Sequence, residues 1–326
     1  TQYLVSGTSV EDGRLVGGRV EAIRRNVDQD GTVRYVLYGL VTGYDGSRPI
    51  IQEYDPPREM DPNWLPTVTH VNGMNVTPQG GIESAQRLQL ELIDAGGEVV
   101  LGSDVPQVLY TYSGHYGIAA DVVDCVAGKL YIDDDVTRVQ TDIILDAVRN
   151  QHRTAVSAHS RGTIKTDNAI LNAHATITSE YLPALLQDPA VIAQADAAVA
   201  AVQAHPQGPG INPMMLRSTY IHVFARQQAE ARATQDLNAY VQVVFAGNAV
   251  QLPTDLVDID IVVATWDPVT IAFGKYFEWA AGDNIEMTES ATTVEGQQHG
   301  FDDNYAANVA RLIVADIGGG GEDDEE

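Results

Sequence analysis

The sequence predicts an α/β protein: a mostly parallel β-sheet with helices on both faces, preceded by a small antiparallel β segment. Three observations lead to this fold class. From residue 67 onward, strand-like apolar runs alternate with helical periodicity, and strands joined by helices form parallel sheets. Residues 1–60 carry strand-like runs joined only by turns. Hydrophobic residues make up 44% of the 326 residues, which is enough for a sizeable core.

The antiparallel segment is predicted over residues 1–60. Residues 14–23 and 32–42 are rich in Val, Leu and Tyr, and the turn between them ends in Asp30-Gly31. A second turn follows at residues 45–47, and prolines then break the chain at positions 56, 57 and 62. We therefore expect two or three antiparallel strands before the main domain.

The α/β domain is predicted over residues 61–317. Its expected strands are residues 67–71, 108–112, 154–158, 239–245 and 258–265. Apolar residues at helical spacing predict helices near residues 82–95, 136–147, 160–174 and 305–313. Residues 318–326 combine glycine with acidic residues and are expected to form a disordered tail.

One stretch of the α/β domain departs from the alternation. Residues 179–236 are rich in alanine and glutamine and contain five prolines. This composition predicts a helical insertion between two strands of the sheet. Its alanine-rich helix near residues 189–204 would either cover a site as a lid or pack as a surface helix, and the sequence favours neither.

Acidic residues dominate the charge, because 45 Asp and Glu stand against 19 Lys and Arg and give a net charge of −26. Such a surface repels phosphate backbones and anionic lipid headgroups, so nucleic acids and anionic membranes are excluded as expected partners. Screening by salt reduces the self-repulsion of such a chain. We therefore expect a halophilic protein rather than an ordinary acidic one.

Cofactors and membrane spans are not expected. Cys125 is the only cysteine, so the chain has no internal disulfide and no multi-cysteine zinc site. The run Asp133-Asp134-Asp135 lacks the spacing of a calcium loop and is typical of a helix N-terminus. No apolar run is long enough to cross a membrane. No signal peptide is visible, which makes the cytoplasm the default location, although Thr1 also fits a processed mature end.

The most informative motif follows the strand at residues 154–158. Ala158-His159-Ser160-Arg161-Gly162 places small residues two before and two after a serine, between a strand and a helix. A tight turn of this kind needs small residues, because strand and helix pack against it, and it exposes the serine above a helix N-terminus. Alternatively, Ser160 is an ordinary helix N-cap. We expect His159 to be a packing or pocket residue, and Arg161 to be a pocket residue or a surface cation.

This motif resembles the nucleophile elbow of the α/β-hydrolase superfamily, and the resemblance covers about residues 67–317. It implies that Ser160 is a nucleophile followed along the chain by an acid and a histidine. Asp267 follows the predicted strand at residues 258–265, and His299 is the only histidine after it. The resemblance thus implies a triad of Ser160, Asp267 and His299. The competing acids are Asp255, Asp258, Asp260 and Asp283.

The same resemblance implies an oxyanion hole of two backbone N–H groups. One belongs to Arg161, and the other would come from Met74 in the loop after the first predicted parallel strand. That loop has Asn72-Gly73 where the family often has His-Gly. The implied activity is that of a serine esterase or lipase that cleaves a carboxylic ester or lipid-like acyl substrate without a cofactor. The alternatives are acyl transfer to an alcohol or amine, and a catalytically silent structural or binding component of a homo-oligomer or larger assembly.

Overall fold

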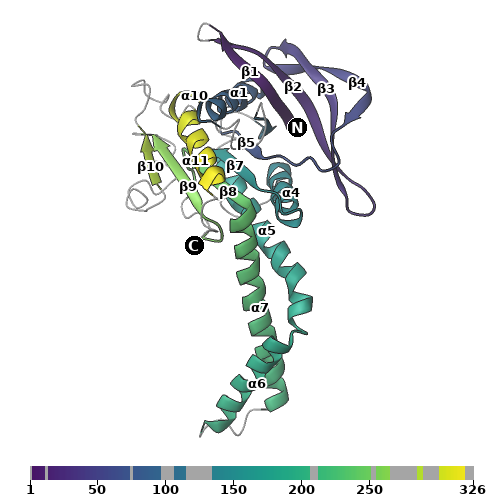
Figure 1. The fold of residues 1–326 in the computed structure, drawn as a ribbon, viewed down its shortest axis with the longest axis vertical. Helices are drawn as coiled ribbons and strands as arrows, with labels where there is room; N and C mark the ends of the chain where they lie inside the picture. The colour runs from purple at the N-terminus through teal and green to yellow at the C-terminus, as the bar shows by residue number, and fades with distance from the viewer. Residues whose placement is uncertain are drawn as a thin grey trace.

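The computed structural model describes residues 2–11, 14–73, 76–96, 106–114, 134–205, 212–250, 255–264, 285–288 and 301–319. Over these residues, ten strands form one sheet in the order β10-β9-β8-β7-β5-β6-β1-β2-β3-β4. Figure 1 shows the two halves of this sheet, with the four N-terminal strands forming an antiparallel wing at one side.

The antiparallel wing consists of β1 (Gln2–Glu11), β2 (Arg14–Val27), β3 (Val33–Asp45) and β4 (Arg48–Glu59). Each strand pairs antiparallel with the next. β1 also pairs antiparallel with β6 (Val108–Thr111), which makes the wing part of the main sheet.

The prediction of a mostly parallel sheet preceded by a small antiparallel segment is therefore wrong, because the sheet is mixed and its antiparallel part contributes four long strands. Pro56 and Pro57, where the sequence predicts a chain break, lie in β4. β4 is the outermost strand, where a proline without an N–H group costs few ladder hydrogen bonds. The class remains α/β in the broad sense.

The parallel half contains β6, β5 (Val68–Val71), β7 (Thr154–His159), β8 (Val241–Ala246), β9 (Ile259–Ala264) and β10 (Ile285–Thr288). All neighbouring pairs among these strands are parallel. The five strands predicted after residue 67 are thus confirmed. Since parallel strands share one direction, their carboxyl ends meet at one edge of the sheet.

Helices cover both faces of the sheet. α1 (Pro78–Asp94), α10 (Phe301–Asn304) and α11 (Ala306–Gly319) pack on one face, where Ile82, Leu88 and Ile313 are buried among strand residues. α4 (Asp135–Arg149), α5 (Arg161–Leu185) and α7 (Pro213–Tyr240) pack on the other. This sandwich of layers holds the carboxyl ends of the central strands in fixed positions.

The predicted helical insertion forms an arm that projects from the sheet (Figure 1). The arm comprises the C-terminal half of α5, α6 (Pro189–Ala204) and the N-terminal half of α7. A small apolar cluster around Leu185, Val191 and Ala225 holds it together. In the described part of the chain, no single helix is long and apolar enough to cross a membrane; only α5 and α6 taken together, across a 79° bend, have that length and composition.

Candidate active site

Ser160 occupies the sharp turn between β7 and α5. Its backbone has φ 54° and ψ −121°, a region that L side chains rarely adopt. Among the described non-glycine residues, only Gln151 shares a positive φ. Such a conformation costs about 1–3 kcal/mol and persists only where the surroundings enforce it, which is why it is concentrated at functional sites.

Neighbouring strands and the first turn of α5 enforce this conformation. The Ser160 N–H donates to the carbonyl oxygen of Ala246 at the end of β8, at 3.0 Å. The carbonyl oxygen of Ser160 accepts from the N–H of Thr163 at 2.9 Å and from its hydroxyl at 2.7 Å. The strained turn is therefore anchored on both sides of Ser160.

Two glycines allow the turn to pack as closely as it does. A Cβ atom on Gly162 would lie 2.8 Å from the carbonyl oxygen of Val71, at the end of β5. A Cβ atom on Gly73 would lie 2.7 Å from the Cβ atom of Ser160. The small residue at position 162 is thus required by the approach of β5, and Gly73 brings the loop after β5 into contact with Ser160.

Ser160 occupies the N-cap position of α5, but its side chain makes no capping hydrogen bond there. Ser160 is fully buried, and its Oγ atom has no hydrogen-bond partner among the described residues. Buried polar atoms normally have partners, because leaving one unsatisfied costs about 1–3 kcal/mol. α5 begins at Arg161, so the positive end of its dipole lies directly beside this hydroxyl.

Three predicted site residues, Asp267, His299 and Met74, lie outside the described residues. The described residues that flank them in the sequence lie at the Ser160 edge of the sheet. β9 runs parallel to β8 and ends at Ala264, three residues before Asp267. The ring of Phe301, two residues after His299, lies 5.5 Å from the ring of His159.

The competing acids that the structure describes are poorly placed for the triad. Asp255 and Asp258 precede β9, and Asp260 is its second residue. All three therefore lie before β9 or in its amino half, away from the edge of the sheet that carries Ser160. Asp283, the fourth competitor, lies outside the described residues.

His159 and His70 form a buried layer under α10. The ring of His159 packs against Phe301 and, at 5.6 Å, Tyr305. His70, in β5, is fully buried with its ring 4.5 Å from Phe301, and its Nδ1 atom is 3.0 Å from Ser157 Oγ. Burial lowers the pKa of His70 from 6.5 to about 3, so its ring is neutral at ordinary pH. His159 thus packs between β7 and the residues that begin at Phe301.

Arg161 is buried rather than a surface cation, so that alternative is wrong. Its Nη2 atom donates to the carbonyl oxygen of Ser113 at 3.0 Å and to that of Gly114, just after β6. Asn72, at the end of β5, also bonds to Ser113. Sequence reasoning missed this polar network. Its only signal was the Asn-Gly pair where the family often has His-Gly.

The described residues hold no group of three or more His, Cys, Asp or Glu side chains arranged for a metal ion. Asp134 instead caps α4, accepting from the N–H of Thr137 at 2.8 Å, and it also pairs with the buried Lys165. Burial alone would raise the pKa of Asp134, but the hydrogen bonds and charge of these partners outweigh it and lower the pKa. The helix N-terminal role predicted for this acidic run is confirmed at Asp134.

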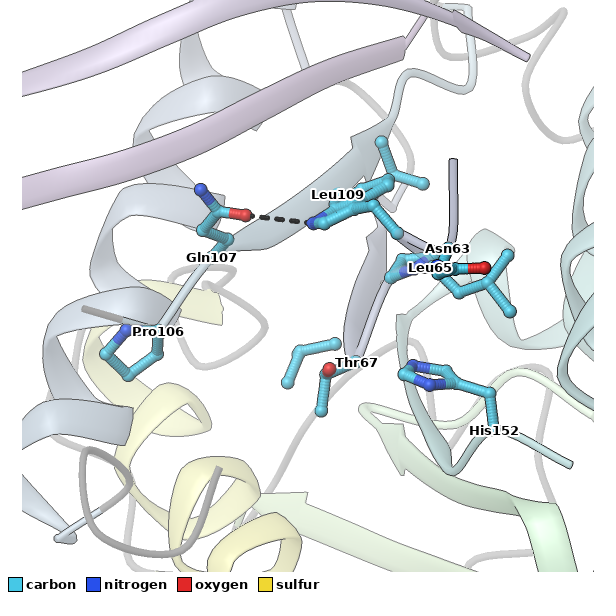
Figure 2. Close-up of a pocket in the computed structure, with 10 residues that line it drawn as sticks. Asn63, Leu65, Thr67, Pro106, Gln107, Leu109 and His152 are labelled. Carbon is cyan, nitrogen blue, oxygen red and sulfur yellow. Dashed lines mark hydrogen bonds between the residues drawn. The ribbon is translucent and has the colours of Figure 1, made fainter. Parts of the chain in front are cut away.

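A separate cavity of about 260 Å³ lies at the opposite edge of the sheet (Figure 2). Its lining includes Trp64, Thr67, Gln107 and His152, which precede β5, β6 and β7. The indole N–H of Trp64 donates to Gln107 Oε1 at 3.3 Å. Because these residues lie at the amino ends of the strands, the cavity is distinct from the Ser160 turn.

Comparisons with known proteins do not place the chain in a family. No protein-family model matches the sequence, and no curated protein matches it either.

Proposed function

We propose that this protein is a serine hydrolase related to the α/β-hydrolases, which cleaves a carboxylic ester or lipid-like acyl substrate through an acyl-enzyme. The observation that carries the proposal is Ser160 itself. A strained turn between strand and helix holds a buried hydroxyl that has no partner among the described residues. A helix N-terminus adjoins it, where a developing oxyanion would be stabilised.

In the proposed mechanism, His299 takes the proton of Ser160 as its oxygen attacks the acyl carbon, while Asp267 orients the imidazole and stabilises its charged form. The N–H groups of Arg161 and Met74 would hold the tetrahedral oxyanion. The imidazolium then protonates the leaving alcohol. Water, deprotonated by His299, cleaves the acyl-enzyme and restores the serine.

A fluorophosphonate probe tests the nucleophile, because it forms a covalent bond only with an activated serine. We expect stoichiometric labelling of Ser160 in the wild-type protein and none in Ser160→Ala. Ser157→Ala is the matched control. Ser157 lies in β7 and is buried like Ser160, but its hydroxyl bonds to His70. Equal labelling of the wild type and Ser160→Ala, or no labelling of either, would contradict the proposal.

The acceptor of the acyl group also belongs to the proposal. We take it to be water, with a small acyl ester as substrate and no nucleic acid as partner, since the net charge of −26 disfavours polyanions. Product analysis with an added alcohol or amine separates hydrolysis from transfer. An acylated acceptor as the main product would replace hydrolase by acyltransferase.

A second candidate is a catalytically silent component of an assembly. It is favoured by the arm, where Met214 and Met215 at the start of α7 are 81% and 65% exposed. Light scattering after size exclusion, together with turnover of a short-chain p-nitrophenyl ester, separates the two candidates. A large ordered assembly without turnover would favour the second.

A further inference from the structure

We propose that Asn72 is a positioning residue, whose side-chain amide holds the Gly73 carbonyl group close to Ser160 and so orients the peptide unit that carries the proposed oxyanion donor. This inference deepens the proposed serine hydrolase function and rests on it. It assigns a role to a side chain that the resemblance left unassigned.

The side-chain amide of Asn72 accepts two hydrogen bonds and donates two. Its Oδ1 atom accepts from the Tyr110 hydroxyl at 2.9 Å and from the Ser113 N–H at 2.6 Å. Its Nδ2 atom donates to the carbonyl oxygens of Gly73 at 2.9 Å and Ser113 at 3.1 Å. With 1% of its surface exposed, Asn72 thus ties the loop after β5 to the loop after β6 in a water-excluded site.

The hydrogen bonds of Asn72 reach the proposed nucleophile through Gly73. Gly73, whose carbonyl oxygen Asn72 holds, is so close to Ser160 that a Cβ atom would overlap with its side chain. Arg161, the residue after Ser160, donates to the same Ser113 carbonyl oxygen as Asn72 does. One network therefore links Gly73, which lies against Ser160, to Arg161, the residue that follows Ser160.

The Tyr110 hydroxyl, which donates to Asn72, is itself held in place by close packing against α1. A Cβ atom on Gly81 would lie 1.7 Å from the Tyr110 hydroxyl oxygen, so this glycine of α1 makes room for the hydroxyl. On the other side of positions 74 and 75 in the sequence, the hydroxyl of Thr77 caps α1 by accepting from the Gly80 N–H at 3.1 Å. Met74 lies between Asn72 and Thr77 in the sequence.

The experiment compares Asn72→Ala, Tyr110→Phe and the double variant by steady-state kinetics with a soluble ester. We expect Asn72→Ala to lower kcat roughly 10- to 100-fold with KM changed less than about threefold, because a displaced oxyanion donor weakens only the transition state. Tyr110→Phe removes one bond to Asn72 and is expected to lower kcat about three- to tenfold. Within Asn72→Ala it should cost nothing further, because its effect passes through Asn72.

Affinity for a trifluoromethyl ketone supplies a readout that a merely structural role would not move. Its tetrahedral adduct needs the oxyanion donors, so its inhibition constant should rise by the same factor by which kcat/KM falls. Tyr35→Phe is the matched control. Tyr35 is buried in another apolar cluster, and its hydroxyl has no hydrogen-bond partner among the described residues, so kcat should stay unchanged.

Thermal unfolding separates loss of function from loss of fold. If Asn72→Ala does not fold, Tyr110→Phe decides by its kcat and ketone affinity. An active wild type with unchanged kcat in the folded variants would overturn the positioning role alone. A wild type without labelling or turnover would overturn the proposed function, and the positioning role with it.

Discussion

Ser160 holds its backbone in a conformation that no part of its own side chain stabilises. The hydrogen bonds to Ala246 and Thr163 and the close approach of Gly73 impose the turn from outside. Stability is thereby given up at one residue to hold a hydroxyl beside a helix N-terminus. Such a trade is typical of sites kept for function rather than for folding.

Replacing Ser160 with glycine should relieve this strain, since glycine adopts positive φ readily. We expect Ser160→Gly to be more stable than Ser160→Ala by about 1–2 kcal/mol, although both lack the proposed nucleophile. Urea unfolding of the two variants measures the difference. If Ser160→Gly proves the less stable variant, the turn is not strained as the structure indicates.

His70 carries a pH prediction at the residue scale. Burial lowers its pKa to about 3, well below the ordinary 6.5, so the unfolded chain binds a proton between these values that the folded chain does not. His70 therefore favours folding fully above pH 6.5, and this contribution is lost as pH falls toward about 3. We expect His70→Gln to flatten the decline of unfolding free energy between about pH 7 and 5. An unchanged slope would mean that folding does not lower the pKa of His70.

At the scale of elements, short apolar runs and helical periodicity predict the strands and helices that depend on neighbouring residues in the sequence. The five strands after residue 67 were predictable because each is a short apolar run before or after a helical period. The helix predicted to end near His174 continues as α5 to Leu185 and includes Pro183 in its last turn. The long antiparallel wing was underestimated, since β1 gains part of its stability by pairing with β6, more than a hundred residues away.

In the candidate site, too, contacts between neighbouring residues were predictable and contacts between distant residues were not. The Ser160 turn was predictable because its small residues lie within five positions of one another. The hydrogen-bond network around Asn72 was not, since its partners Tyr110 and Ser113 lie 38 and 41 residues away. Only the fold brings these side chains together.

The arm also has a consequence at the scale of elements. α5 begins beside Ser160 and has 25 residues, so at 1.5 Å per residue its far end lies about 37 Å from that site. α6 begins beyond this far end. Of the two alternatives for the alanine-rich helix, the structure favours a surface helix over a lid.

Removing residues 187–212 tests this assignment. Leu186 and Met214 line one cavity at the base of the excised segment, so a short Gly-Ser linker can join the two helices. We expect kcat/KM for a soluble short-chain ester to change less than about threefold, because the arm does not reach the site. A large change in kcat/KM with an unchanged unfolding temperature would show that the arm acts as a lid.

At the scale of the whole molecule, charge is the dominant feature. The net charge is −26, and many of the few cations are already paired with acids. Among the described ion pairs are Arg25 with Asp146, Arg153 with Asp316 and Arg217 with Asp196. Charges of one sign in this excess repel one another most in the compact state. The proposed triad needs only one acid, so the proposed chemistry does not account for this excess.

Salt should therefore stabilise the fold. We expect the unfolding temperature and ester turnover to rise as KCl is increased from about 0.1 M to 2 M, because screening shortens the range of the repulsion. Differential scanning calorimetry and initial rates measure the two effects. Greatest stability at low ionic strength would remove the halophilic inference and leave the proposed hydrolase unaffected.

The pairing of β1 with β6 also has a consequence for the order of folding. Among the strands that the structure describes, β1 to β4 otherwise pair only with their sequence neighbours, so residues 2–59 can form their hairpins while the rest of the chain is still being synthesised. Until β6 is made, the outer edge of β1 stays unpaired and open to another nascent chain. We expect slow elongation after residue 59 to favour aggregation of the partly made protein, and rapid delivery of β6 to prevent it.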